Sequence, residues 1–413
     1  MKAIRIGIFG VRRGAYLAIQ LQNNGAEVVA FCDNAPNAKT IIRQYLEGEY
    51  PIYDDFDAFL NHGMDAVLLT NSFHEHAEFA IKALEKNIHV LSECLSNATM
   101  AEGVALVRAA EKSKAIYMLA ENYPYMRFNR EMKKVYEGGT LGKILFGEGE
   151  YNHPAKQGVD CSEGLPSETA WRATLPVTYY ITHSLAPLMY ITGSHPKRVS
   201  ALPIFDPPDE NGCSAKRNGD GTAIITILND DDSVFRVTGC ALFGAHENSY
   251  RIACTKGQME NLRGMGEKVM LRYNAWDVPE GMEENNLYEP EDNADLAKNA
   301  GHGGGDYYAM KEFLDCIREG RRPQFDEYFA TETASVAILG HRSVMGLGQP
   351  YDIPDFHYEN DRKKYENDWA TPFYYRDGRE PNIPCCSRPY YKPGEKRLEN
   401  YRRNLEIWLA NRR

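Results

Sequence analysis

Two histidine-containing segments of this 413-residue chain carry residue types that can move protons. The first is Tyr180–Pro187 (YITHSLAP), and the second is Gly301–Tyr307 (GHGGGDY). Each places a histidine near a tyrosine or an aspartate, where the sequence changes from loop to a periodic pattern. Such side chains act as general acids and bases when they face a bound substrate. We therefore expect His183, Tyr180 and His302 to be catalytic and to converge on one pocket, although they lie far apart in the sequence.

A glycine-rich turn near the N-terminus predicts the cofactor. Gly7–Gly14 (GIFGVRRG) lies between a strand pattern and a helix pattern, where backbone N–H groups can hold a dinucleotide pyrophosphate. Asp33, at the end of the second strand, can hydrogen-bond the ribose hydroxyls and would repel a 2′-phosphate, which favours NAD over NADP. Arg12 replaces the middle glycine of the usual motif and could itself reach a phosphate. The alternative is a plain strand–turn–helix without a ligand.

A second segment, at the end of a later strand, could add contacts to the cofactor. In Thr70–His76 (TNSFHEH), Asn71, His74 and His76 could contact the cofactor riboses, or the segment could only cap the next helix. Histidines two residues apart do not share a helix face, and no His/Cys set has zinc spacing, so we expect no metal. The nine cysteines are scattered, which is typical of reduced core residues.

The chain resembles the Gfo/Idh/MocA oxidoreductases over residues 1–350. The resemblance rests on the N-terminal glycine turn, Ser92–Leu95 (SECL), Asn122–Asn129 (NYPYMRFN) and the late run of strands. Most members carry Glu-Lys-Pro at the end of the fourth strand, and the lysine is their catalytic acid/base. Here Glu93 matches, but Cys94 and Leu95 replace the lysine and the proline. A thiol cannot supply the ammonium that polarises a sugar oxygen, so the ordinary dehydrogenase mechanism is not expected.

Both histidine segments are similar to motifs of one branch, the NAD-dependent glycosidases typified by α-N-acetylgalactosaminidases. That branch has Tyr-Pro-Thr-His…Leu-Gly-Pro and His-Gly-Gly-Met-Asp-Tyr, and Gly305 stands here in place of the methionine. Ordinary members carry an aspartate four residues before the histidine. Tyr179 occupies that position, so we expect no orienting carboxylate beside His183. The resemblance implies cleavage of a glycoside by transient oxidation at sugar C3, removal of the C2 proton, elimination and re-reduction, without net redox.

Two alternatives remain open. The chain could be an NAD-dependent sugar or glycoside dehydrogenase that forms a 3-keto sugar, or a non-catalytic NAD-binding regulatory subunit. The paired histidine motifs disfavour the second, since a sensor does not need them. We expect the cofactor to be bound by Gly10, Arg12, Arg13, Gly14, Asp33, Asn71, His74, His76, Glu93, Cys94 and Asn122. We expect the sugar to contact Tyr123, Arg127, Tyr151, His153, Trp171, Arg172 and Asp306, with Trp171 stacking on a sugar face.

Composition excludes several classes of partner. A net charge of −11 argues against nucleic acid and anionic membranes, which bind basic surfaces. The sequence contains no apolar run of ~18 residues and no signal-peptide pattern at its start, so we expect a cytoplasmic protein without a membrane span. The resemblance implies a homodimer or homotetramer formed through the exposed face of the C-terminal sheet.

These residues are expected to be positioned by an α/β fold. Alternating strand and helix patterns predict a Rossmann-type, doubly wound parallel sheet over residues 1–122. The strands are expected at Ala3–Gly10, Ala26–Asp33, Asp65–Thr70, His89–Ser92 and Ala115–Ala120, and the helices at Ala15–Asn24, Ala38–Leu46, His74–Lys86 and Thr99–Ser113.

After residue 122 the pattern changes to period two, which predicts a C-terminal α+β domain with an open, mostly antiparallel sheet over 123–350. Strands are expected at Ile144–Tyr151, Lys197–Ala201, Gly221–Leu228, Ser233–Leu242 and Ser249–Cys254, and helices at Asn129–Glu137, Asp306–Glu319 and Thr331–Val344. Residues 351–413 form an extension that is rich in aromatic residues and is expected to pack on the body, with a last helix at Lys396–Asn411.

Overall fold

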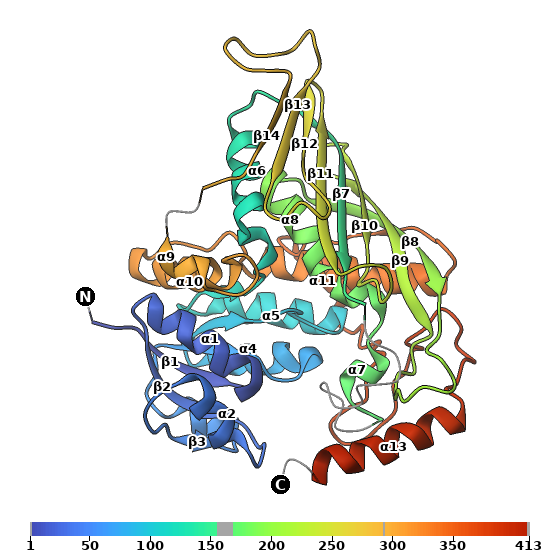
Figure 1. The fold of residues 1–413 in the computed structure, drawn as a ribbon. Helices are drawn as coiled ribbons and strands as arrows, with labels where there is room; N and C mark the ends of the chain where they lie inside the picture. Colours follow the sequence, from blue (N-terminus) through green and yellow to red (C-terminus); the bar gives the residue numbers. More distant parts are fainter. Residues whose placement is uncertain (1, 155–167, 292–293, 411–413) are drawn as a thin grey trace.

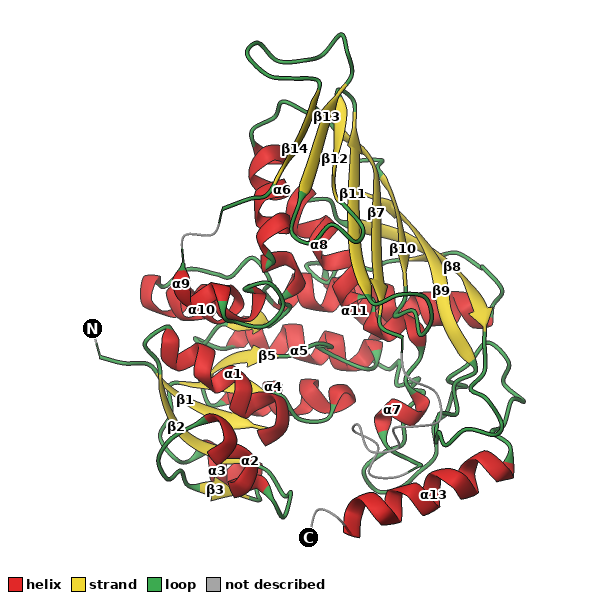
Figure 2. Ribbon diagram, in the orientation of Figure 1, coloured by secondary structure: helices red, strands yellow, loops and turns green. Residues whose placement is uncertain are grey.

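The structure of the protein is a computed structural model that describes residues 2–154, 168–291 and 294–410. It contains two sheets, which lie in the N-terminal part and in the middle of the chain (Figures 1 and 2). Among the described residues, no helix is both long and apolar enough to cross a bilayer.

The first sheet is parallel and doubly wound, as the sequence predicts. β1 (Arg5–Phe9) pairs with β2 (Glu27–Cys32) on one side and with β4 (Ala66–Leu69) on the other. The full strand order is β3-β2-β1-β4-β5-β6. The remaining strands are β3 (Ile52–Tyr53), β5 (His89–Ser92) and β6 (Tyr117–Leu119). Winding reverses between β1 and β4, and open α/β sheets bind ligands at such a reversal, beyond the carboxyl ends of the strands.

Helices cover this sheet because its central strands are apolar on both faces. All four residues of β4 are buried, as expected for a parallel sheet sandwiched between helices. The helices of this part are α1 (Val11–Asn23), α2 (Ala38–Tyr45), α3 (Phe56–Leu60), α4 (His76–Glu85) and α5 (Met100–Lys112). The first helix was predicted to start at Ala15, and this is wrong by four residues: α1 begins at Val11, directly after Gly10.

The second sheet has nine strands, and all its neighbouring pairs are antiparallel except β7 with β10. Its order is β14-β13-β12-β11-β7-β10-β9-β8-β15. Its strands are β7 (Ile144–Asn152), β8 (Pro196–Phe205), β9 (Asp220–Asn229), β10 (Val234–Thr238), β11 (Glu247–Cys254), β12 (Gly257–Asn261), β13 (Val269–Tyr273), β14 (Asn285–Tyr288) and β15 (Tyr351–Asp352). The open, mostly antiparallel sheet is therefore confirmed, and β12 to β14 extend it beyond the predicted strands.

Helices pack between the two sheets (Figure 2). They are α6 (Arg127–Glu137), α8 (Thr182–Thr192), α10 (Gly305–Glu319) and α11 (Glu327–Met345), with the short helices α7 (Trp171–Thr174) and α9 (Asp295–Lys298) nearby. Residues 182–191 of α8 are all buried, and Gly149 of β7 lets the helix approach the sheet. A Cβ on Gly149 would lie 2.0 Å from the Ser184 carbonyl oxygen.

The segment after Pro354 lies against several parts of the body. It contains α12 (Glu359–Tyr365) and α13 (Glu395–Ala410), and α13 crosses the lower edge of the view in Figure 1. Arg362 is buried and forms ion-paired hydrogen bonds with Glu111 of α5. Arg397 is fully buried and donates to the carbonyl oxygens of Pro208 and Lys216.

Candidate active site

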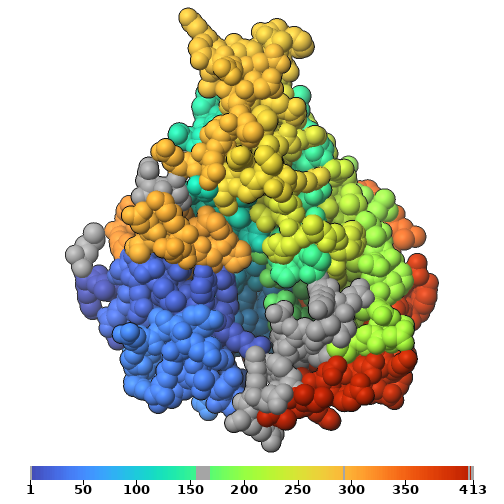
Figure 3. Space-filling model, viewed as in Figure 1, coloured from blue at the N-terminus to red at the C-terminus, as the bar shows by residue number. Residues whose placement is uncertain are grey.

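A cleft of about 700 Å³ opens at the carboxyl ends of β1, β2, β4 and β5. Figure 3 shows the surface hollowed along the edge of the blue N-terminal part that faces the green segments. Gly10 lines the cleft with φ 95°, a backbone conformation that L side chains rarely adopt. A Cβ there would lie 2.4 Å from the Thr70 carbonyl oxygen. The turn between β1 and α1 therefore needs a glycine at this position. Without a side chain there, the backbone itself can form part of the cleft wall.

Most of the predicted cofactor residues line this cleft. They are Gly10, Arg12, Arg13, Asp33, Asn71, His76, Glu93 and Cys94. Gly14 does not line it, because Gly14 faces the sheet. A Cβ on Gly14 would lie 2.4 Å from Cγ2 of Ile8, so Gly14 allows close helix–strand packing. That is the role of the third glycine in dinucleotide-binding turns.

The loop after β4 fits a polar ligand. Both amide atoms of Asn71 are buried without a hydrogen-bond partner in the described structure, and Asn71 lines the cleft. Buried polar atoms without partners are rare, so these atoms suit hydrogen bonds to the cofactor.

The two histidines of this loop differ in position. His76 also lines the cleft, and its Nδ1 lies 3.0 Å from the Leu95 carbonyl oxygen. His74 instead packs against Phe373 of the extension, 4.9 Å between ring centroids, and does not line the cleft. Burial lowers the pKa of both histidines, so both favour the neutral form.

Asp33 faces the cleft at the end of β2. Its carboxylate accepts hydrogen bonds from the backbone N–H groups of Val11, at 2.7 Å, and Ala35, at 2.8 Å. These contacts fix the carboxylate beside the first turn of α1.

Replacing Asp33 with alanine should weaken NAD binding by about 1.5–3 kcal/mol, the usual value of a hydrogen bond to a charged group. The change should also relax discrimination against NADP, because it removes the negative charge that would repel a 2′-phosphate. Titrating wild type and Asp33→Ala with both cofactors checks this. Unchanged affinity for both would contradict the assignment. Melting temperatures of the cofactor-free proteins would control for the lost contacts to Val11 and Ala35.

An ion-paired network joins the cleft to the start of α10. The Arg13 guanidinium donates to Glu93 at 2.8 Å and to Asp306 at 2.6 Å, and the two carboxylates raise the pKa of Arg13. Asp306 also accepts from Asn122 Nδ2 at 2.8 Å and bonds His302 Nδ1 at 2.9 Å. The pKa of Asp306 falls well below its ordinary value because hydrogen bonds and opposite charge outweigh burial. Asp306 thus contacts three protein side chains, and we propose that it positions His302 and Arg13.

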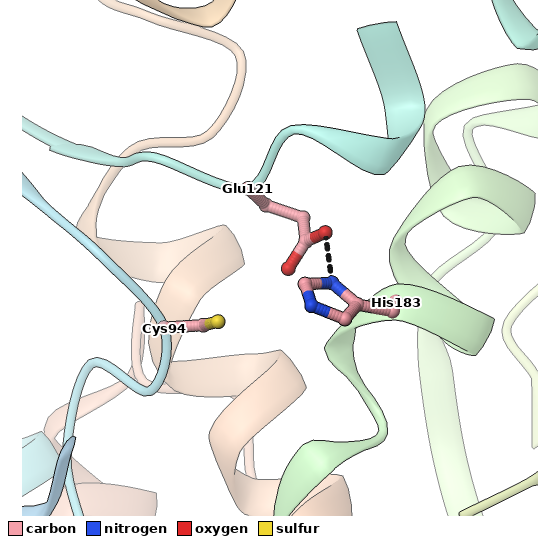
Figure 4. A group of neighbouring side chains, drawn as sticks. All are labelled: Cys94, Glu121 and His183. Atoms are coloured by element: carbon pink, nitrogen blue, oxygen red, sulfur yellow. Dashed lines mark hydrogen bonds and ion pairs between the residues drawn. The ribbon is translucent and has the colours of Figure 1, made fainter. Parts of the chain in front are cut away.

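A carboxylate–histidine pair lies close to Cys94, as Figure 4 shows. His183 Nδ1 lies 2.6 Å from Glu121 Oε1, and both side chains are buried. The expectation of no carboxylate beside His183 is therefore wrong. Sequence spacing led to Tyr179, which points elsewhere and donates to the Ala98 carbonyl oxygen at 3.1 Å. Glu121 instead follows β6. In the sequence it stands directly before Asn122, which begins one of the segments of the family resemblance, and this position is the signal that could have indicated it.

The position of His183 is fixed from one face of its ring and through neighbouring hydrogen bonds. Its carbonyl oxygen accepts from the Tyr250 hydroxyl at 2.5 Å, and Ser184 donates to the Thr238 carbonyl oxygen at 2.7 Å. Tyr123 stacks on the His183 ring at 4.0 Å between centroids, with an interplanar angle of 20°. Because Nδ1 bonds a carboxylate, it is the protonated nitrogen, and Nε2 is left as the acceptor.

Three tyrosines surround this histidine. The ring of Tyr151 lies 4.8 Å from that of His183, and the ring of Tyr180 lies 5.1 Å from it. Tyr123 completes the set. Burial raises the pKa of all three phenols well above the ordinary value. They therefore stay protonated at neutral pH and can donate hydrogen bonds.

The ring of His302 lies 5.5 Å from that of Tyr123 between centroids. Tyr123 thus contacts both histidines, and Tyr180 contacts His183. That they also converge on the nicotinamide stays a prediction.

The remaining predicted sugar contacts are spread more widely. Trp171 lines the cofactor cleft, where its ring stacks on Phe73 at 5.0 Å and lies under the Arg172 guanidinium at 4.2 Å. His153 packs near Tyr151, 5.8 Å between ring centroids. Arg127 points toward Glu289 and Glu267, at 2.7 and 3.7 Å. Arg127 is therefore bound to carboxylates beside the site and does not line the cleft.

One group in the described part of the chain could offer three metal ligands. Ligand atoms of Cys94, Glu121 and His183 lie within 4.8 Å of one another (Figure 4). Burial and two nearby carboxylates raise the pKa of Cys94 well above its ordinary value, so this thiol stays protonated in the absence of a metal. Nδ1 of His183 is also already engaged with Glu121. The group therefore favours proton chemistry, and the absence of a metal stays our prediction.

Family models match two parts of the chain. Residues 4–121 match the Gfo/Idh/MocA model, described as the oxidoreductase family with an NAD-binding Rossmann fold. Residues 245–363 match the model of the glycosyl hydrolase 109 C-terminal domain. The N-terminal part is therefore an NAD-binding domain.

Relatives and solved structures agree with these matches. A glycosyl hydrolase family 109 protein of Streptomyces niveus is 25% identical and aligns over 86% of this chain and 77% of its own length. One from Shewanella pealeana is 24% identical, over 86% of each chain.

Levoglucosan dehydrogenase, in complex with NADH and L-sorbose, has a similar structure. Its TM-score is 0.72 at 17% identity, covering 86% of this chain and all of its own. Aldose-aldose oxidoreductase from Caulobacter crescentus has a TM-score of 0.68 at 16% identity, covering 85% of this chain and 100% of its own. At these identities the two structures show the fold.

Proposed function

We propose that this chain cleaves a glycoside without net redox. The chain joins a Gfo/Idh/MocA NAD-binding domain to a glycosyl hydrolase 109 C-terminal domain, and it is an NAD-dependent enzyme that acts on carbohydrates. The observation that carries the proposal is the buried Glu121–His183 pair, which lies beside a neutral Cys94 where dehydrogenases of this fold have a lysine. The names of the relatives described above, which are glycosyl hydrolase family 109 proteins, support the same choice.

Bound NAD would accept a hydride from sugar C3 and return it at the end of the cycle. The protein must then remove the C2 proton, which the C3 ketone makes acidic. His183 suits this task because Nε2 is its free acceptor and Glu121 stabilises the positive charge that develops on the ring.

The tyrosines suit the opposite role. Because the raised pKa keeps Tyr151 and Tyr180 protonated, either can donate a hydrogen bond to the departing aglycone oxygen or to the C3 oxygen. β-Elimination requires a base and a hydrogen-bond donor close together, and the rings of Tyr151 and Tyr180 lie 4.8 and 5.1 Å from that of His183. His302, held by Asp306, lies near enough to Tyr123 to take part in the later addition of water.

The main alternative is a net dehydrogenase that releases a 3-keto sugar. Incubating the purified enzyme with aryl glycosides, while following aglycone release and absorbance at 340 nm, separates the two. We expect aglycone release over many turnovers with no accumulation of NADH. Stoichiometric NADH without aglycone would establish the dehydrogenase. Neither signal with any glycoside, despite NAD binding, would favour a regulatory subunit.

Cys94 provides a second test of the proposal. Changing Cys94 to lysine should abolish most glycoside cleavage, because a new ammonium beside Glu121 would pair with this carboxylate and draw it from His183. Cys94→Ser keeps a small neutral group and should retain most of the activity. Aglycone release and NADH formation are measured for both variants. A Cys94→Lys enzyme that oxidises free sugars faster than wild type would show an ordinary dehydrogenase scaffold.

We also propose a homodimer or homotetramer. The outer face of the nine-stranded sheet carries large apolar side chains that are about half exposed, namely Leu145, Leu202, Ile204, Ile224, Leu228 and Val234. An apolar face of this kind favours burial against a second copy. Sedimentation at micromolar concentration should show an oligomer, and a monomer would contradict this proposal.

A further inference from the structure

The extension places a cation at the rim of the cofactor cleft. Arg376, between α12 and α13, lines the cleft together with Glu75 and Phe79 of the N-terminal domain. Its Nε donates to Glu75 at 2.7 Å, and a second pair reaches Glu78 at 3.4 Å. The guanidinium lies 4.4 Å above the centre of the Phe79 ring. One face of this planar group therefore rests on protein, and its side chain remains 47% exposed at the cleft.

The segment that carries Arg376 is anchored, so its position is defined by packing. Phe373, three residues earlier, is 1% exposed and packs on His74 at 4.9 Å and on Tyr179 at 5.4 Å between ring centroids. The Thr371 N–H donates to Asn382 Oδ1 at 2.7 Å, which closes the loop around Arg376. His74 thus joins the extension to the loop after β4 and does not contact the cofactor cleft.

This part of the cleft lies where a dinucleotide places its adenosine. Asp33, at the end of β2, is the residue type that holds the adenosine ribose in this fold. Phe79 packs on Phe9 at 4.6 Å and on Phe56 at 4.7 Å, and both of these rings also line the cleft. Cys94 and Tyr180 line the same cleft from the catalytic side. The three phenylalanine rings are tilted against one another and form an apolar wall, with the Arg376 guanidinium over Phe79. This surface suits a purine ring better than a phosphate, because Glu75 and Glu78 already balance the charge of Arg376.

We propose that Arg376 stacks on the adenine of bound NAD, so that the C-terminal extension closes the adenosine end of the cleft. A guanidinium is planar and weakly hydrated, and it stacks readily on aromatic rings. The adenine contact requires only that the domain binds NAD. A further consequence rests on the proposed function: an enzyme that returns its hydride in each cycle gains from a cofactor that stays bound, and the Arg376 contact slows its release.

The test uses fragments of the cofactor and the full-length protein. Calorimetric titration of wild type and Arg376→Ala with NAD⁺, AMP and nicotinamide mononucleotide measures each half separately. We expect the dissociation constants of NAD⁺ and AMP to rise about 3- to 30-fold in Arg376→Ala. The affinity for nicotinamide mononucleotide should stay the same. Arg376→Lys should restore only part of the AMP affinity, since it keeps the charge and loses the planar group.

Arg379→Ala is the matched control. Arg379 belongs to the same segment, pairs with Asp377 at 2.7 Å and lies over the Tyr375 ring, but it does not line the cleft. Its loss should leave all three affinities unchanged. AMP affinity within twofold of wild type in Arg376→Ala, or an equal loss for nicotinamide mononucleotide, would overturn the proposal. Because no glycoside is present, these results are independent of whether the enzyme cleaves one.

Discussion

Replacing His183 with alanine is expected to lower the rate of glycoside cleavage by about 10²- to 10⁴-fold, the usual contribution of a positioned acid or base. Nε2 of His183 is the acceptor, because Nδ1 is bonded to Glu121 at 2.6 Å. The loss should fall on kcat, since proton removal occurs after the substrate is bound. Steady-state aglycone release with saturating NAD measures it.

Two controls separate chemistry from structure. His357→Ala removes a histidine that pairs with Asp355 and stacks on Tyr328, residues that do not line the cofactor cleft, and should leave the rate unchanged. Titration with NAD⁺ should show that His183→Ala still binds the cofactor. A rate reduced only two- or threefold would return His183 to a packing role at the start of α8.

The sequence predicted the sheets well because their signals are local. Apolar β4 and the glycine turn before α1 depend on residues within a few positions, and the order of alternating strands and helices limits how they can connect. Helix α8 is different. All its residues from Thr182 to Ile191 are buried, so it has no polar face and therefore no helical period in its sequence.

The cofactor side of the site was also largely predictable. Asp33, Asn71 and Glu93 follow strands of one parallel sheet, so their side chains must meet at its carboxyl edge. The catalytic side was not predictable in the same way. The carboxylate beside His183 comes from Glu121, 62 residues away, and only the packing of α8 between the sheets brings them together. Arg376 reaches the cleft from still further along the chain, through an extension whose path no local pattern specifies.

Changing Glu121 to glutamine is expected to lower kcat by about 10²- to 10⁴-fold, comparable to replacing the carboxylate that orients a catalytic histidine in a triad. Glutamine has nearly the same shape, but its amide can donate to Nδ1 and hold the proton on Nε2, which removes the base. Oε1 of Glu121 also accepts from the Tyr123 N–H at 3.3 Å, and an amide nitrogen in its place would lose this hydrogen bond. Oε2 has no partner in the described structure, so an amide oxygen in its place loses none. The melting temperature of the cofactor-free protein should therefore fall only slightly, while KM should change little.

A double-mutant cycle decides whether Glu121 acts through His183. If it does, the variant with both Glu121→Gln and His183→Ala should be no slower than His183→Ala alone, because the carboxylate has no histidine left to orient. Glu121→Asp should recover part of the activity, since it keeps the negative charge and shortens the side chain by one methylene. Nitrogen NMR of labelled histidine should show the proton on Nδ1 of His183 in wild type and on Nε2 in Glu121→Gln. Rate losses that multiply in the double variant would mean that Glu121 contacts the substrate independently, through the Oε2 oxygen that has no partner among the described residues.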